Sequence, residues 1–432
     1  MVVPKLVVSS VLTTMVALPW SCSGFLQTIP STHTAPATTI STTPTTTMTT
    51  LWMAYPPPER VKTAGGGIPV VPSGDRLLFD PSMEGMLGGT ESLNRRLQSG
   101  SDCDFLPAVA ATSQQPPAGV KVVDAQAWLE DIDENGTVPP PFAKASSPVT
   151  ATILGRAKII SDDAPGDIQH VLLKLPEGFR YVEGQSLSVI PPGIDPKTGR
   201  NHKPRLYSIA STRYGDLVDG TTVSLCVRRA EYIDPITGTK DPSKQGVCSN
   251  FLCDALPGQT VSVAGPVGKT MTLPQDPSTD IIMVATGTGI APYRAFLHRL
   301  FMEETPARHL FTGKAWLILG VPVTGGLLYP DEFSAMQQNA KLPGQLELTY
   351  AISREATNQK GGKLYVQDVL AEQADKLFER LENGANIYFC GLKGMMPGIL
   401  EALEQVATSR GMSWSQKLKE YKANHQWHVE VY

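Results

Sequence analysis

The chain has 432 residues, a formal net charge of −4 and charged side chains at 18% of its positions. This length predicts two or three domains. The slight negative charge argues against a general nucleic-acid binder. Six cysteines are present, and their spacing fits neither a metal site nor a disulfide framework, so we expect no bound metal and no disulfide bonds.

The first 58 residues contain no Asp or Glu and resemble a targeting segment. Lys5 precedes an apolar run from Val7 to Trp20, and small residues at 21–24 follow before Phe25. This order is typical of a signal peptide, and the run is too short for a comfortable membrane span. A tract rich in Thr, Ser and Pro comes next. We expect 1–58 to be a presequence, although composition alone favours a secretory leader followed by a mucin-like stalk.

Residues 59–145 are rich in Pro and Gly, which predicts a largely disordered extension of unknown role. Two segments, 76–96 and 122–132, interrupt it with apolar residues. Each is a candidate docking motif for a membrane or a protein partner. The alternative is a linker with transient helix.

Residues 146–273 predict an antiparallel β-barrel, because short β-like runs recur between turn residues. The expected strands are Ala151–Ile160, Ile168–Leu175, Ser186–Ile190, Arg205–Ala210, Val223–Arg228 and Thr260–Ala264. One helix is expected at Ser249–Leu256, since Ser is a good first cap and Pro257-Gly258 ends it. Backbone N–H groups at its start, from Gly246 onward, would attract a diphosphate.

The stretch Arg205-Leu206-Tyr207-Ser208 combines several binding chemistries on one strand. Arg205 can hold a phosphate with two hydrogen bonds. Tyr207 can cover a flat ring, and Ser208 can sit beside a reactive ring nitrogen. By itself the stretch also fits an amphipathic strand with one exposed arginine.

Residues 276–432 alternate between strand and helix patterns, which predicts a doubly wound parallel sheet with ligands at the carboxyl ends of its strands. A buried strand is expected at Ile281–Val284, and Gly287-Thr288-Gly289 then leads into a helix at Tyr293–Glu303. The next expected strands are Ala315–Leu319, Glu347–Ile352 and Asn386–Cys390.

The expected strand that ends at Ile352 lacks the acidic residue that would hold a ribose 2′-hydroxyl. Ser353 and Arg354 stand there instead, and Lys363 and Tyr365 follow. Cations and a hydroxyl suit a 2′-phosphate, and Tyr365 can stack on adenine. The pattern therefore favours NADP over NAD, with solvated surface charge as the alternative for Arg354 and Lys363.

Seven segments in order resemble the plant-type ferredoxin–NADP reductases, over a span from about Leu154 to the last residue. They are Arg205–Ser211, Leu225–Arg229, Gly246–Cys253, Gly265–Lys269, Gly287–Pro292, Cys390–Gly394 and Trp427–Tyr432. The resemblance implies a barrel that binds FAD, a second domain that binds NADP, and ferredoxin as the electron partner. The leader, with Phe25 after its cleavage zone, resembles the two-part presequence of complex plastids, which implies the plastid stroma or the thylakoid surface.

The resemblance also implies the site residues. Ser208 would bond near the reactive flavin nitrogen, Cys390 would pack against the nicotinamide, Glu430 would bond to Ser208 and reach solvent, and Tyr432 would stack on the flavin. The cofactor-binding residues implied are Arg205, Leu206, Tyr207, Ser208, Cys226, Val227, Arg228, Tyr232, Val247, Cys248, Ser249, Thr288, Val321, Pro322, Ser353, Arg354, Lys363, Tyr365, Gly391, Leu392 and Glu430.

The implied reaction collects single electrons from ferredoxin, with flavodoxin as an alternative donor, and passes a hydride to NADP, with FAD bridging the two. An acidic ferredoxin would dock on basic residues near the flavin, with Lys197, Arg200, Lys203 and Lys269 as candidates. Three alternatives remain at this stage. They are the same enzyme working from NADPH toward ferredoxin, an NADPH diaphorase that feeds a fused redox domain, and a non-catalytic adaptor.

Overall fold

The computed structural model describes residues 138–432 except Glu304. The expected presequence and both apolar segments of the extension lie outside the described residues. Within them, no helix is both long enough and apolar enough to cross a bilayer.

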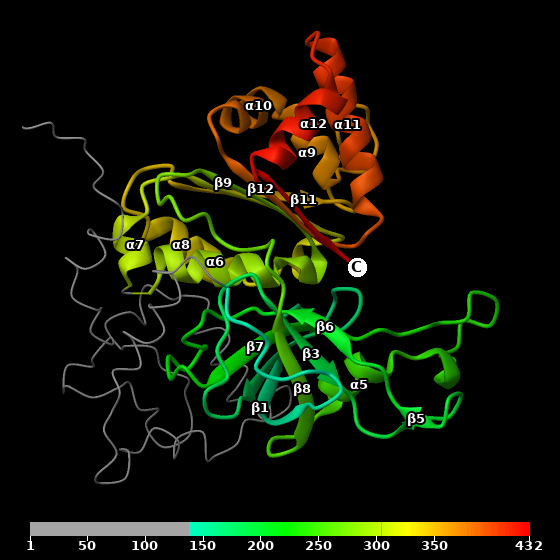
Figure 1. The fold of residues 1–432 in the computed structure, drawn as a ribbon. Coiled ribbons are helices and arrows are strands. Elements are labelled where there is room, and N and C mark those ends of the chain that lie inside the picture. The colour runs from blue at the N-terminus through cyan, green and yellow to red at the C-terminus, as the bar shows by residue number, and fades with distance from the viewer. Residues whose placement is uncertain (1–137, 304) are drawn as a thin grey trace, which may run out of the picture. The chain divides into compact units, whose positions relative to one another are not determined.

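The first domain is an antiparallel six-stranded sheet in the order β6-β3-β8-β1-β2-β7. A bridge between Ile209 and Leu225 joins the chain after β6 to β7, so the sheet closes on itself as the predicted barrel (Figure 1). Its strands are β1 (Val149–Lys158), β2 (Ile168–Lys174), β3 (Ser186–Ile190), β6 (Arg205–Ser208), β7 (Thr222–Arg228) and β8 (Thr260–Val267). A short hairpin of β4 (Ile194–Asp195) and β5 (Arg200–Asn201) precedes β6.

Strand β7 shows why the barrel forms from this sequence. Val223, Leu225 and Val227 alternate along the strand and lie in the barrel core. Cys226, on the opposite face, packs into the core of the second domain. Because successive side chains of a strand point to opposite faces, one strand contributes to both cores.

The barrel begins slightly before the expected boundary at residue 146. The Phe142 and Phe179 ring centroids are 5.2 Å apart, and Ala143 forms a bridge with Gly265. The last residues assigned to the flexible extension are therefore part of the packed barrel.

Helix α5 spans Val247–Asp254 and not the predicted Ser249–Leu256. Gly246 is its N-cap, and the Ser249 hydroxyl accepts a hydrogen bond from the backbone N–H of Ala230. The prediction was wrong because Ser249 holds the preceding loop and does not cap the helix.

The second domain is a five-stranded parallel sheet in the order β11-β10-β9-β12-β13. Its strands are β9 (Ile281–Thr286), β10 (Ala315–Val321), β11 (Leu346–Ile352), β12 (Asn386–Gly391) and β13 (Trp427–Val431). This confirms the predicted doubly wound sheet and adds β13, which the sequence analysis did not assign as a strand.

Helices cover both faces of this sheet (Figure 1). One face carries α6 (Ala291–Phe301), α7 (Pro306–Leu310) and α8 (Pro330–Gln338). The other carries α9 (Val366–Glu372), α10 (Ala374–Glu382), α11 (Met395–Ser409) and α12 (Trp414–Ala423). Strand β9 is buried on both sides, with Met283 in one core and Val284 in the other, as expected for a central parallel strand.

Candidate active site

Two glycines allow the loops after β9 and β12 to approach each other. The turn η5 (Gly287–Ile290) follows β9 directly. A Cβ on Gly289 would lie 2.1 Å from the carbonyl oxygen of Cys390, and a Cβ on Gly391, whose φ is +137°, would lie 2.3 Å from Oγ1 of Thr286. Only glycine fits at these two positions. The carboxyl ends of β9 and β12 therefore form one continuous backbone surface, where an open α/β sheet binds its ligand.

Ser208 and Cys390 meet at this surface although they belong to different domains. The Ser208 Oγ lies 4.0 Å from the Cys390 Sγ. The thiol is fully buried, and burial raises its pKa to about 12. A thiol held in its neutral form suits a packing and aligning role rather than a nucleophilic one.

Glu430 accepts a hydrogen bond from Ser186, at 2.8 Å between Oγ and Oε1, and not from Ser208. The predicted Glu430–Ser208 bond is therefore wrong in this structure. Ser186 stands directly opposite Ser208 in the β3–β6 pairing, so both serines share one face of the barrel. Burial raises the pKa of Glu430, and the Ser186 hydroxyl partly opposes that rise.

Tyr432 is fixed at three points. Its hydroxyl lies 2.7 Å from Oγ1 of Thr288, its N–H donates to the carbonyl of Gly391, and its carbonyl accepts from the N–H of Lys393. The residue is 59% exposed. An accessible ring thus lies beside the turn η5 and the end of β12.

The residues predicted to hold a diphosphate are suited to it. Arg205 is exposed and donates one bond to the carbonyl of Pro204, and a guanidinium has further donors to offer. Helix α5 starts at Gly246 without a side-chain cap, so its first N–H groups can bind an anion. A Cβ on Gly246 would lie 2.6 Å from Cβ of Ala230, which requires glycine at this cap.

Tyr207 connects strand β6 to helix α5. Its hydroxyl interacts with the thiol of Cys248, and burial raises the pKa of the phenol. Cys248 also contacts the carbonyl of Val189, with 3.8 Å between sulfur and oxygen. Next to this pair, Leu206 and Val247 are exposed apolar side chains.

The remaining residues predicted to bind the flavin differ in their exposure to solvent. Cys226 and Val227 are buried, and the Cys226 thiol interacts with the hydroxyl of Tyr329. Arg228 is exposed. The ring of Tyr232 is covered on one face by the ammonium of Lys244, 4.4 Å from the centroid, which leaves the other face for stacking.

The predicted NADP residues are brought together by the backbone. The N–H of Ser353 donates to the carbonyl of Val321, and the N–H of Arg354 donates to that of Pro322. Lys363 pairs with Thr357 in a small turn. The side chains of Arg354, Lys363 and Tyr365 are exposed at this edge of the sheet, and Leu392 is exposed beside β12.

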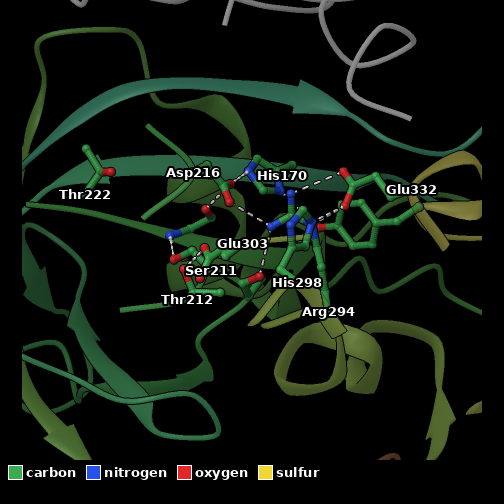
Figure 2. Close-up of polar contacts among 12 residues, drawn as sticks. His170, Ser211, Thr212, Asp216, Thr222, Arg294, His298, Glu303 and Glu332 are labelled. Carbon is green, nitrogen blue, oxygen red and sulfur yellow. Dashed lines mark hydrogen bonds and ion pairs between the residues drawn. The ribbon is translucent and has the colours of Figure 1, made fainter. Parts of the chain in front are cut away.

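A buried ionic network that was not predicted from the sequence lies between the two domains. Figure 2 shows Arg294 of α6 between two carboxylates, Asp216 from the barrel and Glu332 from α8. His170 Nε2 lies 2.8 Å from Asp216, and His298 Nε2 lies 2.8 Å from Glu332. The available signal was an arginine inside the apolar first turns of a helix that packs on a sheet, since such a charge must find a buried partner.

Burial works against the charge of both carboxylates, but Arg294 and the hydrogen bonds from His298 and His170 together outweigh it. They lower the pKa of Glu332 to about 2 and lower the pKa of Asp216 well below its usual value. All three groups are therefore charged at neutral pH.

An antiparallel barrel with an uncapped helix start, joined to a parallel sheet with a glycine turn after its central strand, defines the architecture of a two-domain flavin and nicotinamide oxidoreductase. Residues 283–401 match the family model for the oxidoreductase NAD-binding domain. The chain is 51% identical over 328 residues to the root-type chloroplastic ferredoxin–NADP reductase of Nicotiana tabacum, which covers 75% of this chain and 85% of that protein.

A second relative, the chloroplastic root isozyme 1 of Arabidopsis thaliana, is 52% identical over 322 residues, covering 74% of this chain and 84% of that protein. Among solved structures, the ferredoxin–NADP reductase of Plasmodium falciparum has the same fold, with a TM-score of 0.53 and 24% identity, covering 68% of this chain and 99% of that one. The chain belongs to the ferredoxin–NADP reductase family. Its cofactors are FAD and NADP, and its protein partner is ferredoxin.

Proposed function

We propose that electrons pass between ferredoxin and NADP at the point where Ser208 of the barrel meets Cys390 of the second domain. The 4.0 Å contact between these side chains is the observation that carries the proposal. Bound FAD would supply the chemistry, since it can exchange single electrons with ferredoxin and a hydride with NADP. Hydride transfer requires two flat rings in contact, and strand β6 of the barrel meets the carboxyl end of β12 at this point.

The four catalytic residues act by orientation and hydrogen bonding. Ser208 offers its hydroxyl to the flavin ring. Cys390, neutral and buried, packs against the nicotinamide, and Glu430 connects the site to solvent protons through Ser186. Tyr432 lies at the place the nicotinamide must occupy, so its displacement accompanies binding. None of these roles includes a covalent step.

The FAD diphosphate would lie between Arg205 and the start of α5, with Tyr207 against the flavin ring and Tyr232 against the adenine. Leu206, Cys226, Val227, Arg228, Val247, Cys248 and Ser249 would complete the cradle. The support for this assignment is the uncapped helix start and the exposed guanidinium.

The NADP phosphates would bind at Thr288 and the turn η5, with the 2′-phosphate at Ser353, Arg354 and Lys363 and the adenine on Tyr365. Val321, Pro322, Gly391 and Leu392 would line the path between them. The backbone bonds that hold Ser353 and Arg354 against β10 support this placement.

Ferredoxin would dock near the flavin edge. Lys197, Arg200, Lys203 and Lys269 are all exposed, and three of them lie in or beside the β4–β5 hairpin that leads into β6. Acidic partners associate faster with such a surface at low salt. Flavodoxin, another acidic carrier, is a second partner for the same face.

We place the enzyme in a plastid, because both relatives described above are chloroplastic isozymes. The acid-free leader supports entry through a signal peptide and then a transit peptide, as in complex plastids. Once inside, the enzyme would work in the stroma or on the thylakoid surface, where the extension is the candidate tether.

Two directions of electron flow are candidates. Reduction of NADP by photosynthetically reduced ferredoxin is the first. Flow from NADPH toward ferredoxin is the second, and it is favoured by the root isozyme names of the relatives. Since a catalyst accelerates both directions, the potential of the ferredoxin present would decide between them.

The test is an absorption spectrum of the purified protein followed by NADPH-driven cytochrome c reduction. We expect a flavin spectrum, and a cytochrome c rate that rises when ferredoxin is added. The Cys390→Ala variant should lose most of this rate. Cys253→Ala, which removes a fully buried thiol from the barrel core, is the matched control. A colourless protein that cannot be reconstituted with FAD would contradict the proposal.

A further inference from the structure

We propose that Arg294 is a positioning residue. It sets the separation between strand β6, which carries the proposed flavin-binding residues, and the proposed nicotinamide site at Cys390. The inference rests on the proposed function, because it concerns the geometry of the same transfer point. It assigns a role to a buried network whose members are not among the proposed cofactor-binding residues.

The Arg294 guanidinium joins the two domains at atoms close to the site. Nη1 donates to the carbonyl of Ala210 at 2.9 Å and to Oδ1 of Asp216 at 2.9 Å. Nε and Nη2 donate to the Glu332 carboxylate at 2.8 and 3.2 Å. Ala210 comes two residues after Ser208, the last residue of β6. The guanidinium therefore holds the chain immediately after this strand.

On the other side, Arg294 lies in the first turn of α6, immediately after the turn η5. That turn contains Gly289, which touches Cys390, and Thr288, which touches Tyr432. Every residue of α6 is buried. A shift of this helix would therefore carry the turn with it and change the spacing between Ser208 and Cys390.

The network fixes the guanidinium by its geometry as well as by its charge. Arg294 is 1% exposed and Glu332 is 2% exposed, so their separation from water is nearly complete. His170 binds Oδ2 of Asp216, whose Oδ1 accepts from Arg294. His298 binds Oε2 of Glu332, the same oxygen that accepts from Nε of Arg294 (Figure 2). An arginine fork can bind both acids and a carbonyl at once, whereas a lysine ammonium has one point of attachment.

Buried ion pairs are weak evidence for stability and better evidence for a unique arrangement. A misplacement of about 1 Å at a reacting centre can slow a reaction about 100-fold. Replacement of the Arg294 guanidinium should therefore reduce the hydride transfer rate much more than it reduces the affinity for either cofactor.

The experiment compares Arg294→Lys with the wild type and with Arg380→Lys. Arg380 is the matched control, because it is a mostly buried arginine that pairs with Glu347 inside the second domain alone. Three quantities are measured: the rate at which NADPH reduces the bound flavin in stopped flow, the Kd of adenosine 2′-monophosphate, and the labelling rate of the Cys390 thiol by a maleimide.

For Arg294→Lys we expect flavin reduction at least tenfold slower, a Kd for adenosine 2′-monophosphate within twofold of wild type, and faster Cys390 labelling. Arg380→Lys should leave all three near wild type. Flavin reduction by Arg294→Lys within twofold of wild type would overturn the inference, as would equal losses in rate and in Kd. A wild type that NADPH cannot reduce would instead contradict the proposed function.

A double-mutant cycle keeps the inference testable if Arg294→Lys does not fold. Asp216→Asn removes an ion pair of the Arg294 guanidinium with the first domain, and Glu332→Gln removes one within the second domain. We expect their effects on the flavin reduction rate to be non-additive by at least fivefold, because both act through one side chain. Additive effects on the rate would overturn the inference.

Discussion

Ser186 donates its hydroxyl to Glu430, and in the paired strands it stands directly opposite Ser208. Glu430 is thus bound to Ser186, the cross-strand neighbour of Ser208, and Ser208 is the residue that faces Cys390. We predict that Ser186→Ala raises the pKa of Glu430 further, because the hydrogen bond stabilises the charged form. The limb of the rate–pH profile that follows this carboxylate should therefore move to higher pH. Ser188→Ala is the control, and an unchanged profile would contradict the assignment.

Neutral residues at the 2′-phosphate site should weaken NADP binding selectively. Arg354→Gln and Lys363→Gln each remove a charged donor, which contributes about 1.5–3 kcal/mol, or about 10- to 100-fold in Kd. Binding of NAD should barely change, because NAD lacks the phosphate. Lys360→Gln, an exposed lysine in the same loop, controls for general charge. Equal losses for NADP and NAD, measured by titration calorimetry, would refute the site.

The Cys390 thiol should resist alkylation in the folded protein. Its burial raises the pKa to about 12, so about one thiol in ten thousand is ionised at pH 8. Iodoacetamide followed by peptide mass spectrometry should find Cys390 modified in urea and unmodified in buffer. A lasting adduct on this sulfur during turnover would contradict its non-covalent role.

Alanine at Gly289 should disrupt the site at its closest contact. Its Cβ would overlap the Cys390 carbonyl, so the turn η5 must shift away from β12. We expect hydride transfer to fall at least tenfold while FAD remains bound to the barrel, since a misplaced reacting geometry costs more than a lost contact. Gly394→Ala is the matched control, because Gly394 has φ −64° and open space around its Cβ. A Gly289→Ala enzyme with normal turnover would show that the turn can move without consequence.

Acid should remove the stability that Glu332 contributes. A carboxyl with a lowered folded-state pKa stabilises the fold above its ordinary value of 4.5 and loses that contribution as the pH falls toward about 2. Glu332→Gln should cost about 3–5 kcal/mol at pH 7, because it leaves a buried charge partly unpaired. In urea unfolding, the difference in the free energy of unfolding between wild type and Glu332→Gln should narrow between pH 4.5 and 2.5. A gap that does not vary with pH would show that Glu332 is not the titrating group.

The sequence was sufficient for the barrel and the parallel sheet, because alternation in strands such as β7 and the apolar run of β9 are local patterns. The order of the motifs along the sequence identified Ser208, Cys390 and Tyr432 as candidate site residues. It did not locate Ser186, whose role depends on the register between β3 and β6, nor Arg294, whose partners lie 78 and 38 residues away. Such pairings arise only when distant strands and helices pack, and a serine or arginine carries no sign of its partner. The start of α5 was misplaced for a similar reason, since Ser249 is bound by Ala230 from another loop.

The position of Arg294 also limits how this polypeptide can be divided. The strands of the barrel end at Val267, yet the cation that neutralises Asp216 is supplied 27 residues later in the chain. A barrel fragment excised near residue 274 would carry the Asp216 carboxylate in the turn between β6 and β7 with no arginine opposite it. Folding of the first domain is therefore completed by a residue of the second, and the barrel is not an independent module for transplantation into another protein.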